Sequence, residues 1–311
     1  MPNYVERDGD WVLRPPGKLR QVSLWALVFK AGAAELAALC QKYVAGPSGG
    51  QVTATPLFPG FPFVVLVCAD IARGESDHPQ DKARGWMSER DVGFFVPVTV
   101  TKGSARTVNL IPYLWVDNWA GMIMGRELYG FPKALGEIDW AGDATPGLPI
   151  APPMHFTVWS RVLPPGSPNG HAVDGVVLDV RSTTVTPGVP IPAGVGQIVQ
   201  VFVPVVLAAL GMPAQAFPAL SDIPQLFLKQ FRDTAAPSTA ALQRLIGVDA
   251  HIDAFEGGAV LLNDFILTLP PWQHLDVAGT LGLGAGPTYR PIAAMSGEIE
   301  FTIPAGQVVW P

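Results

Sequence analysis

The hydrophobic positions fall into short runs that are separated by polar and turn-forming residues. Continuous or alternating apolar runs of this length predict β-strands, whereas apolar residues spaced three and four apart predict a helix. Helical spacing is clear in Ala33–Val44, where Leu36, Leu39, Cys40 and Tyr43 share one face. Strands are predicted at Gln21–Phe29, Phe61–Ala69, Phe94–Thr101, His155–Val162, Val176–Val185, Leu226–Arg232, Ala250–Asp253, Val260–Leu269 and Glu298–Ile303.

The charged stretch Arg73–Arg90 separates two of these strands and is expected to be a solvated loop or a short helix. Glycine and proline number 33 and 32 among 311 residues, which suits many short strands and turns better than long helices. We therefore predict a single α+β domain over residues 1–311. It should be mainly antiparallel β, closed into a barrel or cone with a few peripheral helices.

A stretch without any Asp, Glu, Lys or Arg extends from about residue 182 to 221. Its apolar centre, Ile198–Gly211, is shorter than the roughly 20 residues that a membrane span needs, and it contains Gln200 and Pro204. Pro204 can open a helix that Gly211 closes. We expect this uncharged apolar insertion to form core or a pocket wall, with a subunit contact or interfacial element as the alternative, and we expect no membrane span.

Composition and charge exclude several classes of protein. The net charge is −6 and no Lys/Arg cluster exists to neutralise phosphates, so no nucleic-acid partner is expected. Cys40 and Cys68 fall in a helical and a strand pattern, which predicts buried free thiols. His251 and Asp253 would share a strand face as a structural pair, and no histidines have metal spacing, so neither a metal nor a cofactor is predicted. The polar, acidic N-terminus lacks a secretory signal pattern, which favours a cytoplasmic location.

One lysine is distinguished by its surroundings. Lys133 lies between the turn Gly130-Phe131-Pro132 and an apolar run, in a chain that is 49% hydrophobic and only 15% charged. Burial beside apolar groups penalises the ammonium form and lowers the pKa of a lysine, so that a neutral amine becomes available to attack a carbonyl. A solvated loop lysine is the alternative on spacing alone.

The sequence around Lys133 resembles the lysine motif of the acetoacetate decarboxylase family: Gly125-Arg126-Glu127, then an aromatic residue, Pro and Lys, then Leu135-Gly136. Tyr113–Asn118 is similar to the strand that leads into this motif. Asp91–Val98 is similar to a stretch with an acidic residue, a glycine and a proline-containing strand. Weaker similarity runs from Leu24 to Ala45 and from Leu226 into Val260. About half of the chain is covered, in the family's order, which implies the same β-barrel or cone.

The resemblance implies that Lys133 is the nucleophile that forms an imine with the substrate. Asp91 aligns with a family glutamate and is implied for proton transfer or for positioning the imine. Lys30 aligns with the family's substrate-side arginine and would meet the substrate carboxylate as a point charge instead of a fork. Tyr129, four residues before the lysine, would present its hydroxyl to the substrate.

Three residues next to the lysine are expected to support it. Phe131 belongs to the turn, and Arg126 and Glu127 precede it. These last two are either catalytic or an ion pair that fixes the turn, and the sequence does not decide between the two roles.

Three departures from the family pattern predict a shift in chemistry. Ala134 stands where the family decarboxylases carry a second lysine, Val64 falls on a second family glutamate, and Lys30 replaces the arginine. We therefore expect a homo-oligomeric Schiff-base lyase whose substrate is a small oxo acid other than acetoacetate, and hydrophobic oxo acids are among the candidates. The reaction would be a decarboxylation or an aldol- or dehydratase-type conversion. The rival hypothesis, which Ala134 and Val64 favour, is a non-catalytic ligand-binding or assembly member of the same fold.

Overall fold

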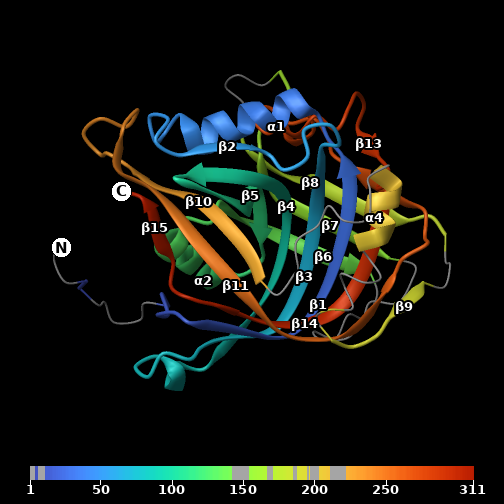
Figure 1. Cartoon of the computed structure of the whole chain (residues 1–311), viewed down its shortest axis with the longest axis horizontal. Helices are drawn as coiled ribbons and strands as arrows, with labels where there is room; N and C mark the ends of the chain where they lie inside the picture. The colour runs from blue at the N-terminus through green and yellow to red at the C-terminus, as the bar shows by residue number, and fades with distance from the viewer. Residues whose placement is uncertain are drawn as a thin grey trace.

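The computed structural model describes residues 4–5, 11–141, 154–166, 171–184, 188–194, 196, 203–210 and 222–311. Strands dominate this part of the chain (Figure 1). The strands are β1 (Gly17–Lys30), β2 (Thr53–Pro56), β3 (Phe63–Ser76), β4 (Trp86–Lys102), β5 (Ser104–Val116), β6 (Lys133–Ala141), β7 (His155–Val162), β8 (Val173–Ser182), β9 (Val189–Ile191), β10 (Asp222–Arg232), β11 (Ala240–Val260), β12 (Phe265–Thr268), β13 (Thr288–Tyr289), β14 (Ala293–Ile303) and β15 (Gln307–Trp310). The helical segments are α1 (Ala33–Cys40), η1 (Gln41–Ala45), η2 (Lys82–Arg84), α2 (Trp119–Met124), η3 (Gly125–Tyr129), α4 (Val203–Leu210) and α5 (Val277–Leu281).

Seven strands curl into a partial ring in the order β4, β3, β1, β14, β11, β10 and β5. The strand β5 pairs with β4 along most of its length but meets β10 at only two residue pairs. Among the described residues every pairing is antiparallel except those of β5 with β10 and with β6. The predicted mainly antiparallel sheet with peripheral helices is confirmed, and the expected closed barrel takes the form of a partial ring.

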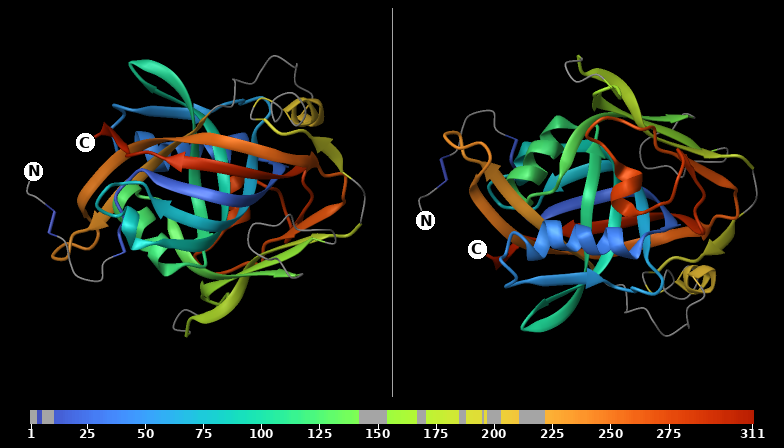
Figure 2. Two further views of the ribbon diagram at one scale, coloured as in Figure 1. Left: turned by 90° about the horizontal axis from the view of Figure 1, so that it is seen from below. Right: turned by 90° about the horizontal axis from the view of Figure 1, so that it is seen from above.

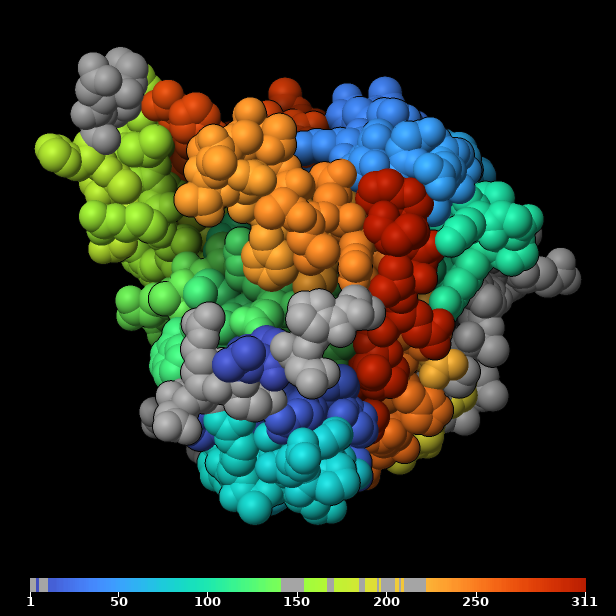
Figure 3. All heavy atoms as spheres, turned by 90° about the vertical axis from the view of Figure 1, so that its left-hand side faces the viewer, coloured from blue at the N-terminus to red at the C-terminus, as the bar shows by residue number. Residues whose placement is uncertain are grey.

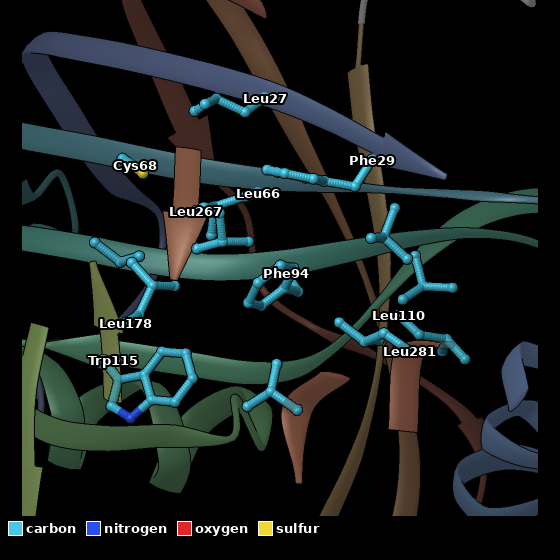
Figure 4. Packing of buried hydrophobic residues seen from close by; sticks show 14 of the residues in the cluster. Leu27, Phe29, Leu66, Cys68, Phe94, Leu110, Trp115, Leu178, Leu267 and Leu281 are labelled. Carbon is cyan, nitrogen blue, oxygen red and sulfur yellow. The ribbon is translucent and has the colours of Figure 1, made fainter. Parts of the chain in front are cut away.

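A second layer branches from the ring at β5, where β6 begins and β7, β8, β12 and β13 follow in order. Figure 2 shows these strands beside the ring. The largest hydrophobic cluster fills the space between the layers and includes Trp25, Phe29, Phe94, Phe156 and Leu178 (Figure 4). The apolar face of α1 covers the same cluster, which accounts for its amphipathic pattern.

The other face of the ring strands carries separate, smaller clusters. Side chains alternate between the two faces of a strand, so Leu27 and Phe29 join the large cluster while Val22, Ala26 and Val28 point to the opposite, concave side. The functional residues described below lie on this concave side.

The two ends of the charged stretch Arg73–Arg90 are strand, contrary to the expectation of a loop or a short helix throughout. They extend β3 and β4 into a long hairpin, and residues 77–85, with the short helical segment η2, connect them. Arg73 pairs with Glu75 at the surface, whereas Ser76, Asp81 and Glu89 are buried. Predicted strands are confirmed within β1, β3, β4, β7, β8, β10, β11, β12 and β14, and α1 with η1 confirms the predicted helix.

The described part of the uncharged stretch 182–221 packs on the concave face. As predicted, a helix, α4, forms around Pro204; Gly211 lies outside the described residues. Ile191 of β9 and Val206 of α4 are buried against Ala26, Val28 and Met295. Within the described residues, no helix combines the length and the apolar character that a membrane span requires. Cys40 and Cys68 are buried free thiols, as predicted.

Candidate active site

Lys133 is the first residue of β6, at the point where the second layer leaves the ring. It pairs with Leu114 of β5, and Leu114 pairs with Gly93 of β4. Partner residues on adjacent strands share a face, so the lysine side chain lies on the same face as Gly93, Asp91 and Glu89. The strand register alone therefore brings the lysine and two carboxylates together on the concave side of the ring.

The ammonium of Lys133 contacts both carboxylates. Its Nζ donates to Glu89 Oε1 and lies 3.6 Å from Asp91 Oδ2. The side chains of Lys133 and Glu89 are 9% and 7% exposed, and that of Asp91 is 23% exposed. Burial of Lys133 confirms the hypothesis of a sheltered amine and excludes a solvated loop lysine. The structure thus forms a compact cluster of one amine and two acids.

Burial and charge act in opposite directions on the pKa of Lys133. Burial of the ammonium lowers this pKa, but the carboxylates of Asp91 and Glu89 raise it, and the net direction is upward. The expectation of a depressed lysine pKa is therefore wrong, because a second carboxylate, that of Glu89, contacts the amine. An ion pair with Glu89 holds the proton on the amine.

The same surroundings raise the pKa of Asp91. Burial raises its pKa well above the usual range, the negative charge of Glu89 raises it further, and the Lys133 ammonium lowers it only in part. Asp91 Oδ1 is buried and has no hydrogen-bond partner among the described residues. The cluster therefore combines one amine with two carboxyl groups, a combination that can both accept and donate protons.

Glu89 is the site residue that the sequence analysis missed. It precedes Asp91 by two positions on β4, so that the two side chains point to the same side. This spacing of two could have predicted that Glu89 joins Asp91 at the site, but only if the residues before Asp91 were assigned to a strand. The assignment of Arg73–Arg90 to a loop concealed it.

The helical segment α2–η3 lies directly against the cluster, and glycine makes this approach possible. The single side-chain oxygen of Asn118, Oδ1, accepts from the backbone N–H groups of Ala120 and Gly121 at the start of α2. A Cβ on Gly121 would lie 1.8 Å from the Glu89 carboxylate, and one on Gly125 would lie 2.9 Å from Lys133 Cδ. The segment ends at Gly130, whose φ of 83° starts the turn into β6.

The four residues that surround the lysine turn have distinct positions. Arg126 Nη1 donates to the backbone oxygen of Lys133 at 3.0 Å, so it anchors the start of β6. Glu127 accepts from the Tyr4 hydroxyl at the surface, and no ion pair between Arg126 and Glu127 forms within the described chain. The Phe131 ring centre is 5.8 Å from Lys133 Nζ, and Tyr129 packs on Phe131 with a ring distance of 5.4 Å.

Lys30 lies far from this cluster. It is exposed at the end of β1, where it pairs with Phe63 of β3. The β1 residue in line with Glu89 is Val22, because Val22 pairs with Ile71 and Ile71 pairs with Glu89. At roughly 3.3 Å per residue, the intervening strand spans about 26 Å. The structure therefore does not bring Lys30 to Lys133. Val64 is a core residue on the opposite face and does not reach the site either.

A cavity of about 50 Å³ that is partly open to solvent lies beside the cluster. Glu89 and Tyr129 are among its lining residues, and a Tyr129 hydroxyl that faces the substrate stays a prediction. Most of the remaining wall is apolar and comes from Leu13, Leu19, Ile71, Met87, Met124 and Ile303. Figure 3 shows this side of the molecule, where the N-terminal segment in dark blue lies beside the β3–β4 connection in cyan.

The described part of the uncharged stretch does not line this cavity. The residues Ile191 and Val206 pack near Ala26 and Val28, further along the concave face. Apolar lining comes instead from the N-terminal segment, β1, β3, β4, α2 and β14.

Metal ligation finds no support in the described part of the chain, where no group of three or more His, Cys, Asp or Glu side chains could hold an ion. His251 bonds to Asp222, whereas Asp253 bonds to Arg20 and Thr302. The two residues therefore have separate structural partners instead of forming the predicted pair.

Comparison with known proteins places these features in context. The family model of acetoacetate decarboxylase matches residues 56–155, which include Glu89, Asp91 and Lys133. A search of curated protein sequences finds no significant match. Among solved structures, an acetoacetate decarboxylase from Legionella pneumophila superposes with a TM-score of 0.60 at 14% identity, over 99% of this chain and 91% of the other.

Two further solved structures are similar in fold. The enduracididine biosynthesis enzyme MppR, in complex with pyruvate, has a TM-score of 0.55 and 16% identity, over 97% of this chain and 93% of MppR. An acetoacetate decarboxylase-like enzyme from Sphingomonas wittichii RW1 has a TM-score of 0.53 and 13% identity, over 94% of this chain and 92% of the other. At these identities the likeness concerns the fold.

Proposed function

Because the chain belongs to the acetoacetate decarboxylase superfamily, we propose that it is a lyase that forms a Schiff base between Lys133 and an oxo acid. The buried contact of Lys133 with Glu89 and Asp91 carries this proposal. MppR was solved in complex with pyruvate, which supports a small oxo acid as the class of substrate.

The first steps need a neutral amine. Glu89 accepts a proton from the Lys133 ammonium against the raised pKa of the amine. Burial reduces the cost of this transfer, because a neutral pair needs less solvation than an ion pair. The amine nitrogen then bonds to the carbonyl carbon of the substrate, and the carbonyl oxygen takes the proton that Asp91 holds. The added nitrogen returns one proton to Asp91, which leaves a neutral carbinolamine.

Loss of water completes the imine. Protonated Glu89 transfers its proton to the carbinolamine hydroxyl, water departs, and the protonated imine remains beside the restored Glu89 carboxylate. The imine accepts the electron pair of an adjacent bond. If that bond leads to a carboxylate, CO2 leaves and an enamine remains, and Asp91 gives its proton to the enamine carbon before hydrolysis releases the product. If it leads to hydrogen, the Glu89 carboxylate takes the proton, the enamine adds to an aldehyde, and Asp91 gives its proton to the alkoxide that forms.

Between these outcomes, we propose chemistry other than decarboxylation of acetoacetate. A short substrate such as acetoacetate would leave the apolar cavity beside Glu89 unfilled. We also propose a homo-oligomeric protein of the cytoplasm, with one domain and the insertion at about 182–221.

A non-catalytic binding module is the second candidate. The raised pKa of Lys133 favours it, because an ammonium that is locked in an ion pair cannot attack a carbonyl. In this case the cavity would bind an apolar ligand and the three charged groups would be structural.

Borohydride trapping separates the two candidates. The protein is incubated with a panel of 2-oxo and 3-oxo acids, reduced, and examined by intact mass and peptide mapping. We expect a covalent adduct at Lys133 that Lys133→Met abolishes. Lys229→Met is the matched control, because Lys229 is a second partly buried lysine, next to η3, whose pKa is lowered by burial. An adduct at Lys229, or none at Lys133 in folded protein, would refute the lyase.

A further inference from the structure

The wall of the cavity specifies more about the substrate than the chemistry of the lysine does. On the premise of the proposed function, we infer that the cavity beside Glu89 receives an apolar chain of the substrate. Lys133 therefore acts on oxo acids that carry such a chain at the end remote from the carboxylate, in preference to short oxo acids and to dicarboxylic ones.

The lining of the cavity suits an apolar chain. Glu89, whose carboxylate contacts Lys133, lines it together with the apolar side chains of Leu13, Leu19, Ile71 and Met87. Leu13 is 3% exposed, so the N-terminal segment is a fixed wall of this space. An apolar chain that enters it loses contact with water and fills a space that otherwise weakens the packing of its wall.

The charges on the cavity wall disfavour a second carboxylate on the substrate. Arg14 is the cation among the described lining residues, and it is engaged by Asp81 through both its backbone N–H and its Nη1, at 2.7 and 2.9 Å. The acids Glu75 and Glu89 pair with Arg73 and Lys133. A second, remote carboxylate on the substrate would therefore enter an apolar space in which the one cation among the described lining residues is already paired with Asp81, which is strongly unfavourable.

The test measures how trapping at Lys133 depends on the substrate chain. Pyruvate, 2-oxobutanoate and 2-oxohexanoate form a series, and 2-oxoadipate matches 2-oxohexanoate in carbon number but ends in a carboxylate. We expect the concentration for half-maximal adduct to fall about tenfold over the two methylenes from 2-oxobutanoate to 2-oxohexanoate. It should be at least ten times higher for 2-oxoadipate.

A charge placed in the cavity should reverse the last preference. Leu19 is half-buried in the cavity wall, so Leu19→Arg supplies the missing cation and should make 2-oxoadipate trap better than 2-oxohexanoate. Met87→Arg repeats the test from another strand if Leu19→Arg does not fold. Leu262→Arg, at a residue that is 55% exposed, is the control and should keep the wild-type order.

The outcomes distinguish this inference from the function on which it rests. Adducts at Lys133 with equal half-maximal concentrations for pyruvate and 2-oxohexanoate, or with 2-oxoadipate preferred by the wild type, would overturn the inference and leave the Schiff-base lyase intact. Absence of any adduct at Lys133 in folded wild-type protein would overturn both.

Discussion

Two carboxylates on one strand set the charge state of Lys133. Glu89 and Asp91 alternate with Arg90, so both face the amine while Arg90 points to the other side, where it stacks over Trp140. The same alternation bears on residue 134. Ala134 packs against the large cluster between the layers, so a lysine at this position would point away from Lys133 along the strand normal. The missing second lysine therefore changes the other face of β6, and the local field at Lys133 comes from the two acids.

We expect Glu89→Gln to lower the pKa of Lys133. The substitution removes the negative charge and the hydrogen bond of Glu89, both of which raise this pKa, and leaves the burial that lowers it. The neutral amine should then appear at lower pH than in the wild type. The measurement is the pH profile of Lys133 acylation by an amine-selective reagent, followed by peptide mapping.

Glu127→Gln is the control for this profile, because Glu127 lies at the surface and accepts from Tyr4. Its profile should coincide with that of the wild type. A Glu89→Gln profile that is unchanged, or displaced to higher pH, would show that Glu89 does not hold the proton on Lys133.

Among the site residues, the sequence predicted those that belong to a local sequence motif. The motif from Gly125 to Gly136 identified Lys133, and the acidic–glycine–proline pattern identified Asp91, which the fold brings to within 3.6 Å of the amine. Glu89 and Lys30 were misjudged because their positions depend on strand register, which joins residues far apart in sequence. No local pattern shows that Val22, and not Lys30, lies level with Glu89.

Among the elements, α2–η3 has the closest relation to the site. It follows the capping residue Asn118, crosses the cluster and ends at Gly130, and two of its glycines lie against Glu89 and Lys133. The glycines of this segment thus allow its backbone to pack directly against the side chains of Glu89 and Lys133. In the Gly125-Arg126-Glu127 motif, Gly125 serves this packing and Arg126 holds the start of β6 through its hydrogen bond to the Lys133 backbone oxygen.

Gly121→Ala should disturb the site more than the fold. The new Cβ would overlap the Glu89 carboxylate, which is the free end of a side chain and can move away from Lys133. A displacement of about 1 Å in a catalytic group can cost on the order of a hundredfold in rate, so we expect imine trapping to slow by about tenfold or more. Trapping rate and thermal midpoint are measured together.

Gly60→Ala is the matched substitution, because nothing lies within 4 Å of its added Cβ and its φ is not positive. It should leave trapping and the thermal midpoint unchanged. If Gly121→Ala forms the imine at the wild-type rate, the contact between α2 and Glu89 has no part in catalysis.

Elements with a simple pattern were predictable, and those that depend on pairing were not. The helix α1 and the strand β7 have clear apolar periodicity and agree with their predicted segments. The β3–β4 hairpin is rich in charge, yet Arg73 and Glu75 satisfy each other in solvent while the backbone groups are paired across the strands. Strand β6 escaped prediction because its first residue was interpreted through chemistry and not through its pairing with β5.

For the whole molecule, the decisive feature is the division of the ring into two faces. The outer face meets the second layer and α1 across the large cluster, and the concave face holds the lysine cluster near one end of β1 and the packing of β9 and α4 near the other. This division could not be derived from strand patterns alone, because many ring strands are apolar on both faces. It separates the stability of the α4 region from the chemistry of Lys133.

This separation can be tested on neighbouring residues of α4. Val206 is 3% exposed and packs against Ala26 and Met295, whereas Val205 is 37% exposed. Val206→Asp loses apolar burial and places a carboxylate against the core, so we expect the free energy of unfolding to fall by about 3 to 5 kcal/mol. Val205→Asp should change it by less than about 0.5 kcal/mol.

The same pair of variants decides how the uncharged stretch contributes to the molecule. Urea denaturation gives the two free energies, light scattering gives the assembly state, and borohydride trapping gives the state of the site. If α4 is part of the core, Val206→Asp is destabilised, Val205→Asp keeps its assembly, and the folded fraction of each still forms the Lys133 adduct. Dissociation of Val205→Asp would instead identify the outer side of α4 as a subunit contact, the alternative that its exposed apolar residues leave open. Equal stability of Val206→Asp and wild type would contradict the core assignment.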